Sequence, residues 1–176
     1  MNSSIVLTFI VDDQPGRVEL LSHTVVRHHG NWLESRMSCL AGKFAGIARI
    51  QIPESELEAL TRALHALQEQ GFTIVVEKSS VVAPLTKQQA LSITIVGQDR
   101  PGIVHEISQA LAQHQVNVTE LHSDVTSAPM SGEPLFEATA DANVPKELDL
   151  DELNAELEAV ANELNIEISL AIPDEQ

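Results

Sequence analysis

A tight turn of four residues, Asp99-Arg100-Pro101-Gly102, follows an apolar run, and a similar turn, Asp13-Gln14-Pro15-Gly16, stands 86 residues earlier. Aligned without a gap, residues 5–38 and 91–124 are identical at nine of 34 positions. The identical pairs are Thr8/Thr94, Asp13/Asp99, Pro15/Pro101, Gly16/Gly102, Val18/Val104, Ser22/Ser108, His28/His114, Asn31/Asn117 and Glu34/Glu120. The period is far longer than that of a solenoid repeat. The repeat therefore indicates a duplicated domain, and we expect each copy to have its own core.

Composition restricts the possible functions. The 176 residues carry a net charge of −16, which disfavours direct binding of DNA or RNA through a basic face. Cys39 is the only cysteine, so the sequence predicts no internal disulfide and fits a reducing cytoplasm. The apolar run near the N-terminus is too short for a membrane span and lacks the basic segment of a signal peptide. We therefore expect a cytoplasmic protein with no membrane or direct nucleic-acid partner.

Apolar periodicity predicts the order β-α-β-β-α-β in each copy. This order is the ferredoxin-like arrangement, an α+β fold with two helices on one face of a four-stranded antiparallel sheet. The expected strands are 4–11, 32–40, 44–52 and 72–77 in the first copy and 91–96, 116–127, 135–144 and 166–172 in the second. The expected domains are 1–78 and 91–176, joined by a linker over 79–90.

Helix signals complete this interpretation. The predicted apolar stripes are Val18, Leu21, Ser22 and Val25 in the first copy, and Val104, Ile107, Ser108 and Leu111 in the second. The later helices carry Leu57, Leu60, Leu64 and Leu67, and Leu150, Leu153, Leu157, Val160 and Leu164. Gly30 is expected to end the first helix, and capping boxes are expected at Ser55/Glu58 and Asp149/Glu152.

The second copy has a longer hairpin loop, over 127–134, where the first has a short turn around Gly42. Such a loop can contact a ligand or a partner, or it can be a tolerated surface insertion. The acidic helix over 149–163 likewise reads either as a solvated face or as a docking site for a basic partner.

The repeated turns are the main candidates for chemistry. Each ends a strand and begins a helix, where unpaired N–H groups and the helix dipole attract a carboxylate. Asp13 or Asp99 can cap the helix or receive an ammonium group, and a glycine leaves the backbone uncovered. A zwitterionic amino acid suits this chemistry. The alternative is that Asp-x-Pro-Gly is only a capped turn.

The sequence Gly97-x-Asp99-Arg100-Pro101-Gly102-Ile103-Val104, with Asn117 and Glu120 further on, resembles the ACT domain family over roughly residues 4–172. The resemblance implies regulatory domains that bind amino acids near the first strand-to-helix turn and perform no catalysis. It implies ligand-binding roles for Asp99, Arg100, Pro101, Gly102, Ile103 and Asn117, and for their counterparts Asp13, Gln14, Pro15, Gly16 and Asn31. The first copy departs from the pattern at Val11, which replaces Gly97, and at Arg17, which replaces Ile103.

The leading hypothesis is a non-catalytic sensor that binds an amino acid, with glycine the first candidate, and controls transcription through a DNA-binding protein partner. The resemblance also leaves open a regulatory or oligomerisation module of an amino-acid or one-carbon metabolic enzyme. Exposed sheet edges favour a homodimer. The second turn is expected to dominate because Arg100 can bond a carboxylate, with Asn117 approaching the same turn. On this view Gly102→Val blocks the ligand without unfolding the domain, provided that the φ of Gly102 is negative.

Other chemistry is weakly indicated. The seven histidines lack the spacing and carboxylate partner of a helical metal site, so no metal and no catalytic residue is expected. Cys39 is most simply a small core residue, and Trp32 a core or interface residue.

Overall fold

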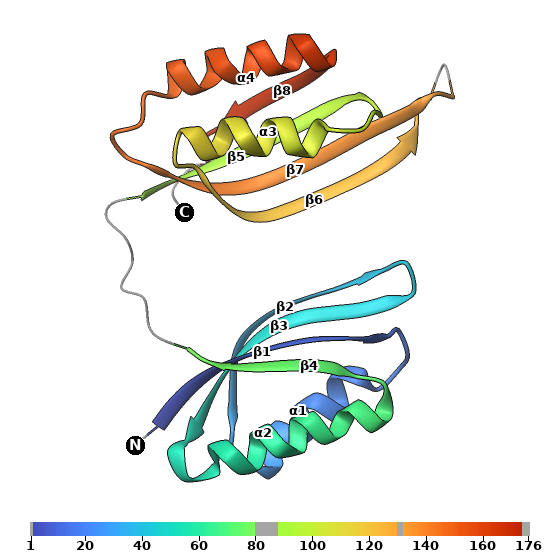
Figure 1. The fold of residues 1–176 in the computed structure, drawn as a ribbon, viewed down its shortest axis with the longest axis vertical. Helices are drawn as coiled ribbons and strands as arrows, with labels where there is room; N and C mark the ends of the chain where they lie inside the picture. The colour runs from blue at the N-terminus through green and yellow to red at the C-terminus, as the bar shows by residue number, and fades with distance from the viewer. Residues whose placement is uncertain (1, 80–87, 130–131, 174–176) are drawn as a thin grey trace. The chain divides into compact units, whose positions relative to one another are not determined.

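The computed structural model describes residues 2–79, 88–129 and 132–173, and the chain divides into two compact units, Met1–Val82 and Ala83–Gln176. In each unit, two helices cover one face of a four-stranded sheet (Figure 1). The predicted fold class, two ferredoxin-like units in tandem, is confirmed.

The first unit has the strand order β2-β3-β1-β4, with all neighbours antiparallel. A two-residue turn, Ala41-Gly42, closes the β2–β3 hairpin, and both residues have positive φ. The elements are β1 (Asn2–Asp12), α1 (Arg17–Arg27), β2 (Asn31–Leu40), β3 (Lys43–Pro53), η1 (Glu54–Glu56), α2 (Leu57–Ala66), η2 (Leu67–Gln70) and β4 (Thr73–Lys78).

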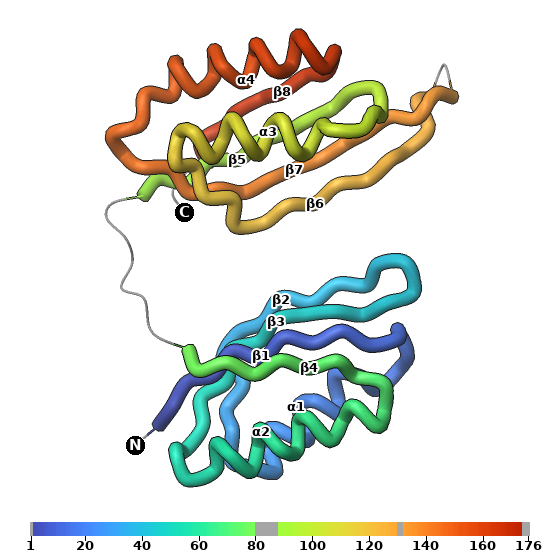
Figure 2. Tube along the Cα trace, viewed as in Figure 1, coloured from blue at the N-terminus to red at the C-terminus, as the bar shows by residue number. Residues whose placement is uncertain are grey.

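The second unit repeats this topology as β6-β7-β5-β8. Its elements are β5 (Gln88–Gln98), α3 (Ile103–Gln113), β6 (Asn117–Ser127), β7 (Pro134–Pro145), α4 (Leu150–Leu164) and β8 (Ile166–Ala171). Figure 2 traces the β6–β7 hairpin, whose loop lies where the longer loop was predicted. Residues 130 and 131 of that loop lie outside the described residues.

Each unit has its own apolar core between helices and sheet. The core of the first unit centres on β1 and α2, where Ile5, Leu7, Leu60 and Leu64 are fully buried. The predicted stripe of α2 is confirmed, since Leu57 and Leu67 are buried as well. In α4, Leu153, Leu157 and Leu164 are buried, while Leu150 and Val160 pack against the core at its margin.

The predicted stripes of α1 and α3 are only half right: Leu21 and Val25 in α1 are buried as predicted, and so are Ile107 and Leu111 in α3. α3 buries Ile103, Ile107, Ala110 and Leu111, whereas Val104 and Ser108 are exposed. α1 buries the matching residues Leu21, Thr24 and Val25, and Val18 is exposed. Both stripes have helical spacing. In α3 the buried stripe begins at Ile103, one residue before the predicted start at Val104. The matching residue of α1 is Arg17, which is polar.

Several boundary predictions are corrected. α1 ends at Arg27, and His29 rather than Gly30 takes the left-handed conformation, with φ 59°. The amides of His29 and Gly30 donate to Val26 and Val25, which is a Schellman motif. The capping box at Ser55 is absent, because Ser55 lies in the 3-10 turn before α2.

The Asp149 cap is confirmed, since its carboxylate accepts from the amides of Asp151 and Glu152 at 2.9 and 3.3 Å. β5 begins at Gln88, three residues before the predicted strand start at Leu91, so the last residues of the predicted linker over 79–90 belong to this strand. Residues 80–87 of that linker lie outside the described residues.

Candidate functional site

The two repeated turns share an unusual backbone conformation. Gly16 and Gly102 are the N-cap residues of α1 and α3, with φ 89° and 102°, and no side chain caps either helix. The predicted capping role of Asp13 and Asp99 is therefore wrong. The positive φ explains the glycines, since residues with a side chain rarely adopt it. The condition attached to Gly102→Val is not met, so that substitution would strain the turn whether or not a ligand binds there.

Each turn is tied to the neighbouring hairpin through its aspartate backbone. The amide of Asp13 donates to the carbonyl of Gly42, and the amide of Asp99 donates to the carbonyl of Pro134, both at 3.0 Å. The hairpin end and the helix N-terminus are therefore fixed relative to each other in both domains. The side chains of Asp13 and Asp99 are not used as caps, and that of Asp13 is hydrogen-bonded with Cys39.

Arg100 and Arg17 occupy different sequence positions but contact the same structural feature. Arg100 Nη1 donates to the carbonyl of Leu164, at the end of α4, at 3.3 Å. Arg17 Nη1 donates to Gln70, at the end of η2, also at 3.3 Å. Both carbonyls precede a residue with positive φ, Gly71 or Asn165. A guanidinium therefore lies beside each turn. The ungapped alignment of the two copies missed Arg17 in this role, because it sets Gln14 opposite Arg100.

The first turn holds its arginine with additional contacts. Arg17 Nη2 donates to Gln14 Oε1 at 2.8 Å, Nε donates to the carbonyl of Asp12 at 3.2 Å, and the guanidinium lies 5.4 Å from the Phe72 ring centroid. Gln14, which the alignment sets opposite Arg100, therefore accepts a hydrogen bond from the guanidinium of Arg17. The position of Arg17 directly after Gly16 was the available signal for this role.

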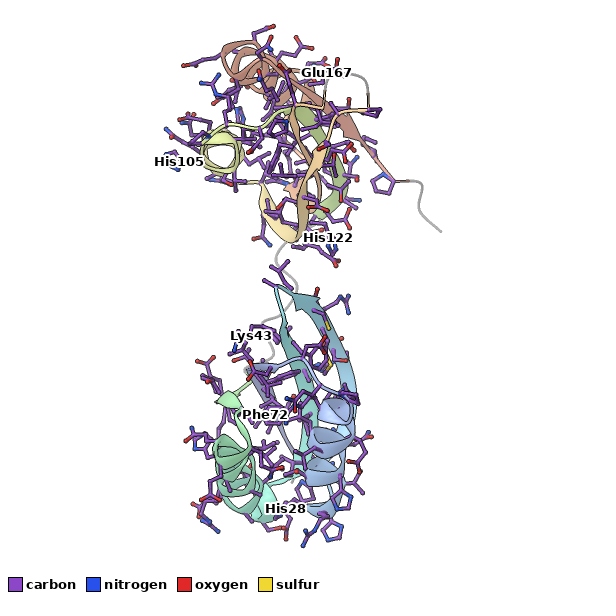
Figure 3. The ribbon with its side chains drawn as sticks, turned by 90° about the vertical axis from the view of Figure 1, so that its right-hand side faces the viewer. His28, Lys43, Phe72, His105, His122 and Glu167 are labelled. Atoms are coloured by element: carbon purple, nitrogen blue, oxygen red, sulfur yellow. The ribbon has the colours of Figure 1, made fainter. Side chains whose placement is uncertain are left out.

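Charged groups from the hairpin end also reach the first turn. Lys43, labelled in Figure 3, pairs with Asp12 and lowers the pKa of that carboxyl, chiefly by donating a hydrogen bond and then by its charge. Cys39 is exposed, so its predicted place in the core is wrong. Desolvation, followed by a hydrogen bond to Asp13 and repulsion from its charge, raises the pKa of the Cys39 thiol.

The Asp12–Lys43 pair gives a pH-dependent prediction. The folded-state pKa of Asp12 is lowered, so the pair stabilises the first domain above the ordinary Asp pKa of about 3.9, and this contribution is lost as the pH falls through the folded-state value. In Lys43→Met we expect the Asp12 pKa to rise towards its ordinary value in a carbon-detected NMR titration. Arg49→Met removes a cation that pairs with Glu34 and is the control. An unchanged Asp12 pKa in Lys43→Met would contradict this assignment.

The two asparagines do not lie at the turns. Asn117 pairs with Asn143 on β7, whereas Gln98, at the end of β5, pairs with Leu135. Asn143 and Leu135 are eight residues apart on β7, so Asn117 lies about 27 Å along the sheet from the end of β5. Asn31 lies at the corresponding distance from its own turn, because it pairs with Gln51 and Asp12 pairs with Lys43. The helix after each turn carries the chain back along the sheet, so the next strand begins at the opposite end.

A hollow of about 380 Å³ lies beside the end of β5 in the second domain. Gly97 lines it from β5, and Asn162, Asn165 and Glu167 line it from the end of α4 and from β8. The position of Gly97 is held by Val11 in the first domain. The second turn is thus next to a hollow with amide and carboxylate groups.

Two features found in other proteins are absent from the part of the chain that the structure describes. Within residues 2–79, 88–129 and 132–173, no three His, Cys, Asp or Glu side chains are grouped as metal ligands. None of the helices described has the length and apolar character needed to cross a bilayer.

Comparisons with known proteins agree with the fold. ACT domain profiles match residues 3–77 and 91–162. A UPF0237 protein of Methanococcus maripaludis is 33% identical over 79 residues, which is 44% of this chain and 81% of that protein.

Two solved structures match both domains together. A protein from Galdieria sulphuraria has a TM-score of 0.87 at 27% identity, covering 98% of this chain and 99% of its own. A candidate glycine cleavage system transcriptional repressor has a TM-score of 0.72 at 20% identity, covering 99% of both chains. The second likeness shows a shared fold. With one profile match in each unit, the chain belongs to the ACT domain family and consists of two ACT domains in tandem.

Proposed function

We propose that this chain is a non-catalytic, amino-acid-sensing regulator in the cytoplasm, and specifically a glycine-responsive transcriptional regulator of the glycine cleavage system. The observation that carries the proposal is the recurrence, in both ACT domains, of a strand-to-helix turn whose helix has no side-chain cap. The full-length likeness in fold to the candidate repressor supports the choice of glycine as effector.

The proposed effector site is the turn at residues 99–102 together with the N–H group of Ile103. The helix dipole and backbone amides favour the ligand carboxylate, and Asp99 is available for its ammonium group. Arg100 uses one N–H for Leu164, which leaves other donors of its guanidinium for the carboxylate. The turn at residues 13–16 is a second, weaker site in this proposal, because Gln14 and the main-chain carbonyls of Asp12 and Gln70 already accept hydrogen bonds from Arg17.

Regulation would follow from linkage. An effector that binds one state of the protein more tightly shifts the affinity for a partner, and the partner shifts the effector affinity by the same factor. The net charge of −16 makes a DNA-binding protein a better direct partner than DNA itself. In a gel-shift assay we expect no shift of promoter DNA by this protein alone at physiological salt. A tight complex without any added protein would rule out indirect control.

The chain is also proposed to act as a homodimer. β2, β4, β6 and β8 are the outer strands of the two sheets, and such edges can pair with another strand. Light scattering that gives the mass of one chain at working concentration would remove the dimer from the proposal.

Calorimetric titration with glycine and the other amino acids tests the effector site. We expect saturable binding of glycine, and at least about tenfold weaker binding to Arg100→Gln, because a charge-assisted hydrogen bond contributes roughly 1.5–3 kcal/mol. Arg62→Gln, which removes an exposed arginine paired with Glu58, is the matched control. Binding of another amino acid would move the assignment from glycine to that ligand. If no amino acid binds, the hypothesis that the chain is an amino-acid sensor is contradicted.

A further inference from the structure

The second domain contains an apolar cavity of about 80 Å³ between α3 and the sheet. Ile103, Ile107 and Leu111 line it from α3, and Val118, Ala138 and Ala140 line it from β6 and β7. Ser108, on the exposed side of α3, is the one residue with a polar side chain among those around the cavity. A space with so few polar partners does not hold water well and suits an apolar occupant.

The first domain has a larger side chain at the corresponding position of its sheet. Trp32 is the second residue of β2 and pairs with Ile50, and its side chain packs against the core of that domain. Val118 is the second residue of β6 and pairs with Ala142. Both members of the pair are smaller in the second domain, so the volume that the indole ring and Ile50 take in the first is only partly replaced.

The cavity opens at an apolar mouth. Val104, Val118 and Leu121 surround it, and they are 44%, 38% and 46% exposed. Exposed apolar side chains around a hollow are typical of a binding site rather than of a packing defect inside a core. The enclosed space is smaller than the roughly 150 Å³ cavity known to hold benzene, so a ring would lie partly in the cavity and partly in the mouth.

We propose that the second domain binds a small apolar ring compound, or the ring of a larger molecule, in the cavity between α3 and β6. The ring would take the place that the side chain of Trp32 takes in the first domain. This site is separate from the backbone amides of the turn. Ile103 connects the two, because it is the first residue of α3 after Gly102 and its side chain lines the cavity. The proposal does not depend on the glycine hypothesis.

Methyl NMR of the full chain, titrated with indole, tests the proposal. We expect saturable shifts of the methyl groups of Ile93, Ile107 and Leu111, all of which line the cavity. Val118→Trp should abolish these shifts because its own ring fills the site, and Val118→Phe serves if the larger ring disturbs the fold. His122→Trp is the matched control, because His122 is an exposed residue of the same strand and does not line the cavity (Figure 3).

The first domain supplies a converse experiment. Trp32→Val should open the equivalent space, so indole should then shift the methyl groups of Leu21 and Val25, which it leaves unchanged in the wild type. Loss of the Ile107 response in Val118→Trp with retention in His122→Trp supports the site. An indole response that survives in Val118→Trp and Val118→Phe, or no saturable response in the wild type, overturns it.

Discussion

Gly97→Ala should destabilise the second domain by about 3 kcal/mol or more, one of the largest effects expected for a single added methyl group. A Cβ at this position would lie 2.4 Å from Ile166 Cγ2 and 2.8 Å from Ile166 Cα. The backbone cannot move away easily, because Gly97 pairs with Phe136 on one side and with Ile166 on the other. The added methyl group therefore has to separate β5 from β8.

Gly102→Ala is the matched control for this prediction. A Cβ at Gly102 meets nothing within 4 Å, so only its positive φ opposes the substitution, at a cost of about 1–2 kcal/mol. Trp32 is the only tryptophan and lies in the first domain, so hydrogen exchange resolved by peptide is the suitable measurement for the second. Equal losses of protection in the two variants would show that the contact with Ile166 relaxes at little cost.

The topology was predictable because each element carried a local signal that tertiary packing did not override. Apolar runs indicated most strands, alternating apolar residues indicated the last strand, and leucines at helical spacing indicated α2 and α4. The faces of α1 and α3 were not predictable in the same way. Val18 and Val104 have helical spacing too, and only the direction in which the strands pack decides between the two stripes.

The candidate site shows a second limit of sequence comparison. An ungapped alignment sets Arg100 opposite Gln14, and it led to the expectation that only the second turn has a guanidinium. In the folded domains the target of the arginine is a carbonyl at the end of the last helical segment of the same domain, Leu164 of α4 or Gln70 of η2. Residues on either side of the proline and glycine can reach that carbonyl. The same contact to that carbonyl is therefore kept although the arginine changes position by three residues.

Asn117 illustrates the same difficulty over a longer distance. It follows α3 closely in the sequence, and this nearness suggested contact with the turn at the other end of that helix. An eleven-residue helix is about 16 Å long, and it carries the chain to the far end of the sheet. The antiparallel register then fixes Asn117 beside Asn143. The repeat of this asparagine in both copies has another cause than effector binding at its own turn.

Leu60→Ala and Leu153→Ala should each destabilise one domain by about 2–5 kcal/mol and leave the other nearly unchanged. Leu60 in α2 and Leu153 in α4 are both fully buried, and they belong to different cores. Removing three carbons from such a side chain loses its transfer free energy and leaves a cavity that the surrounding strands fill only in part. Peptide-resolved hydrogen exchange measures both domains in a single experiment, and Trp32 fluorescence gives an independent readout of the first.

The pair of variants also decides whether the two ACT domains unfold as separate units. If each core is self-sufficient, Leu60→Ala lowers protection in β1 and β3 alone, and Leu153→Ala lowers it in β5 and β7 alone. Exposed Leu33→Ala is the control for the loss of an apolar side chain outside a core, and it should cost less than about 0.5 kcal/mol. A loss of protection shared equally by both domains in either core variant would contradict separate unfolding. That result would favour a coupled sensor, in which an effector bound to one domain changes the stability of the other.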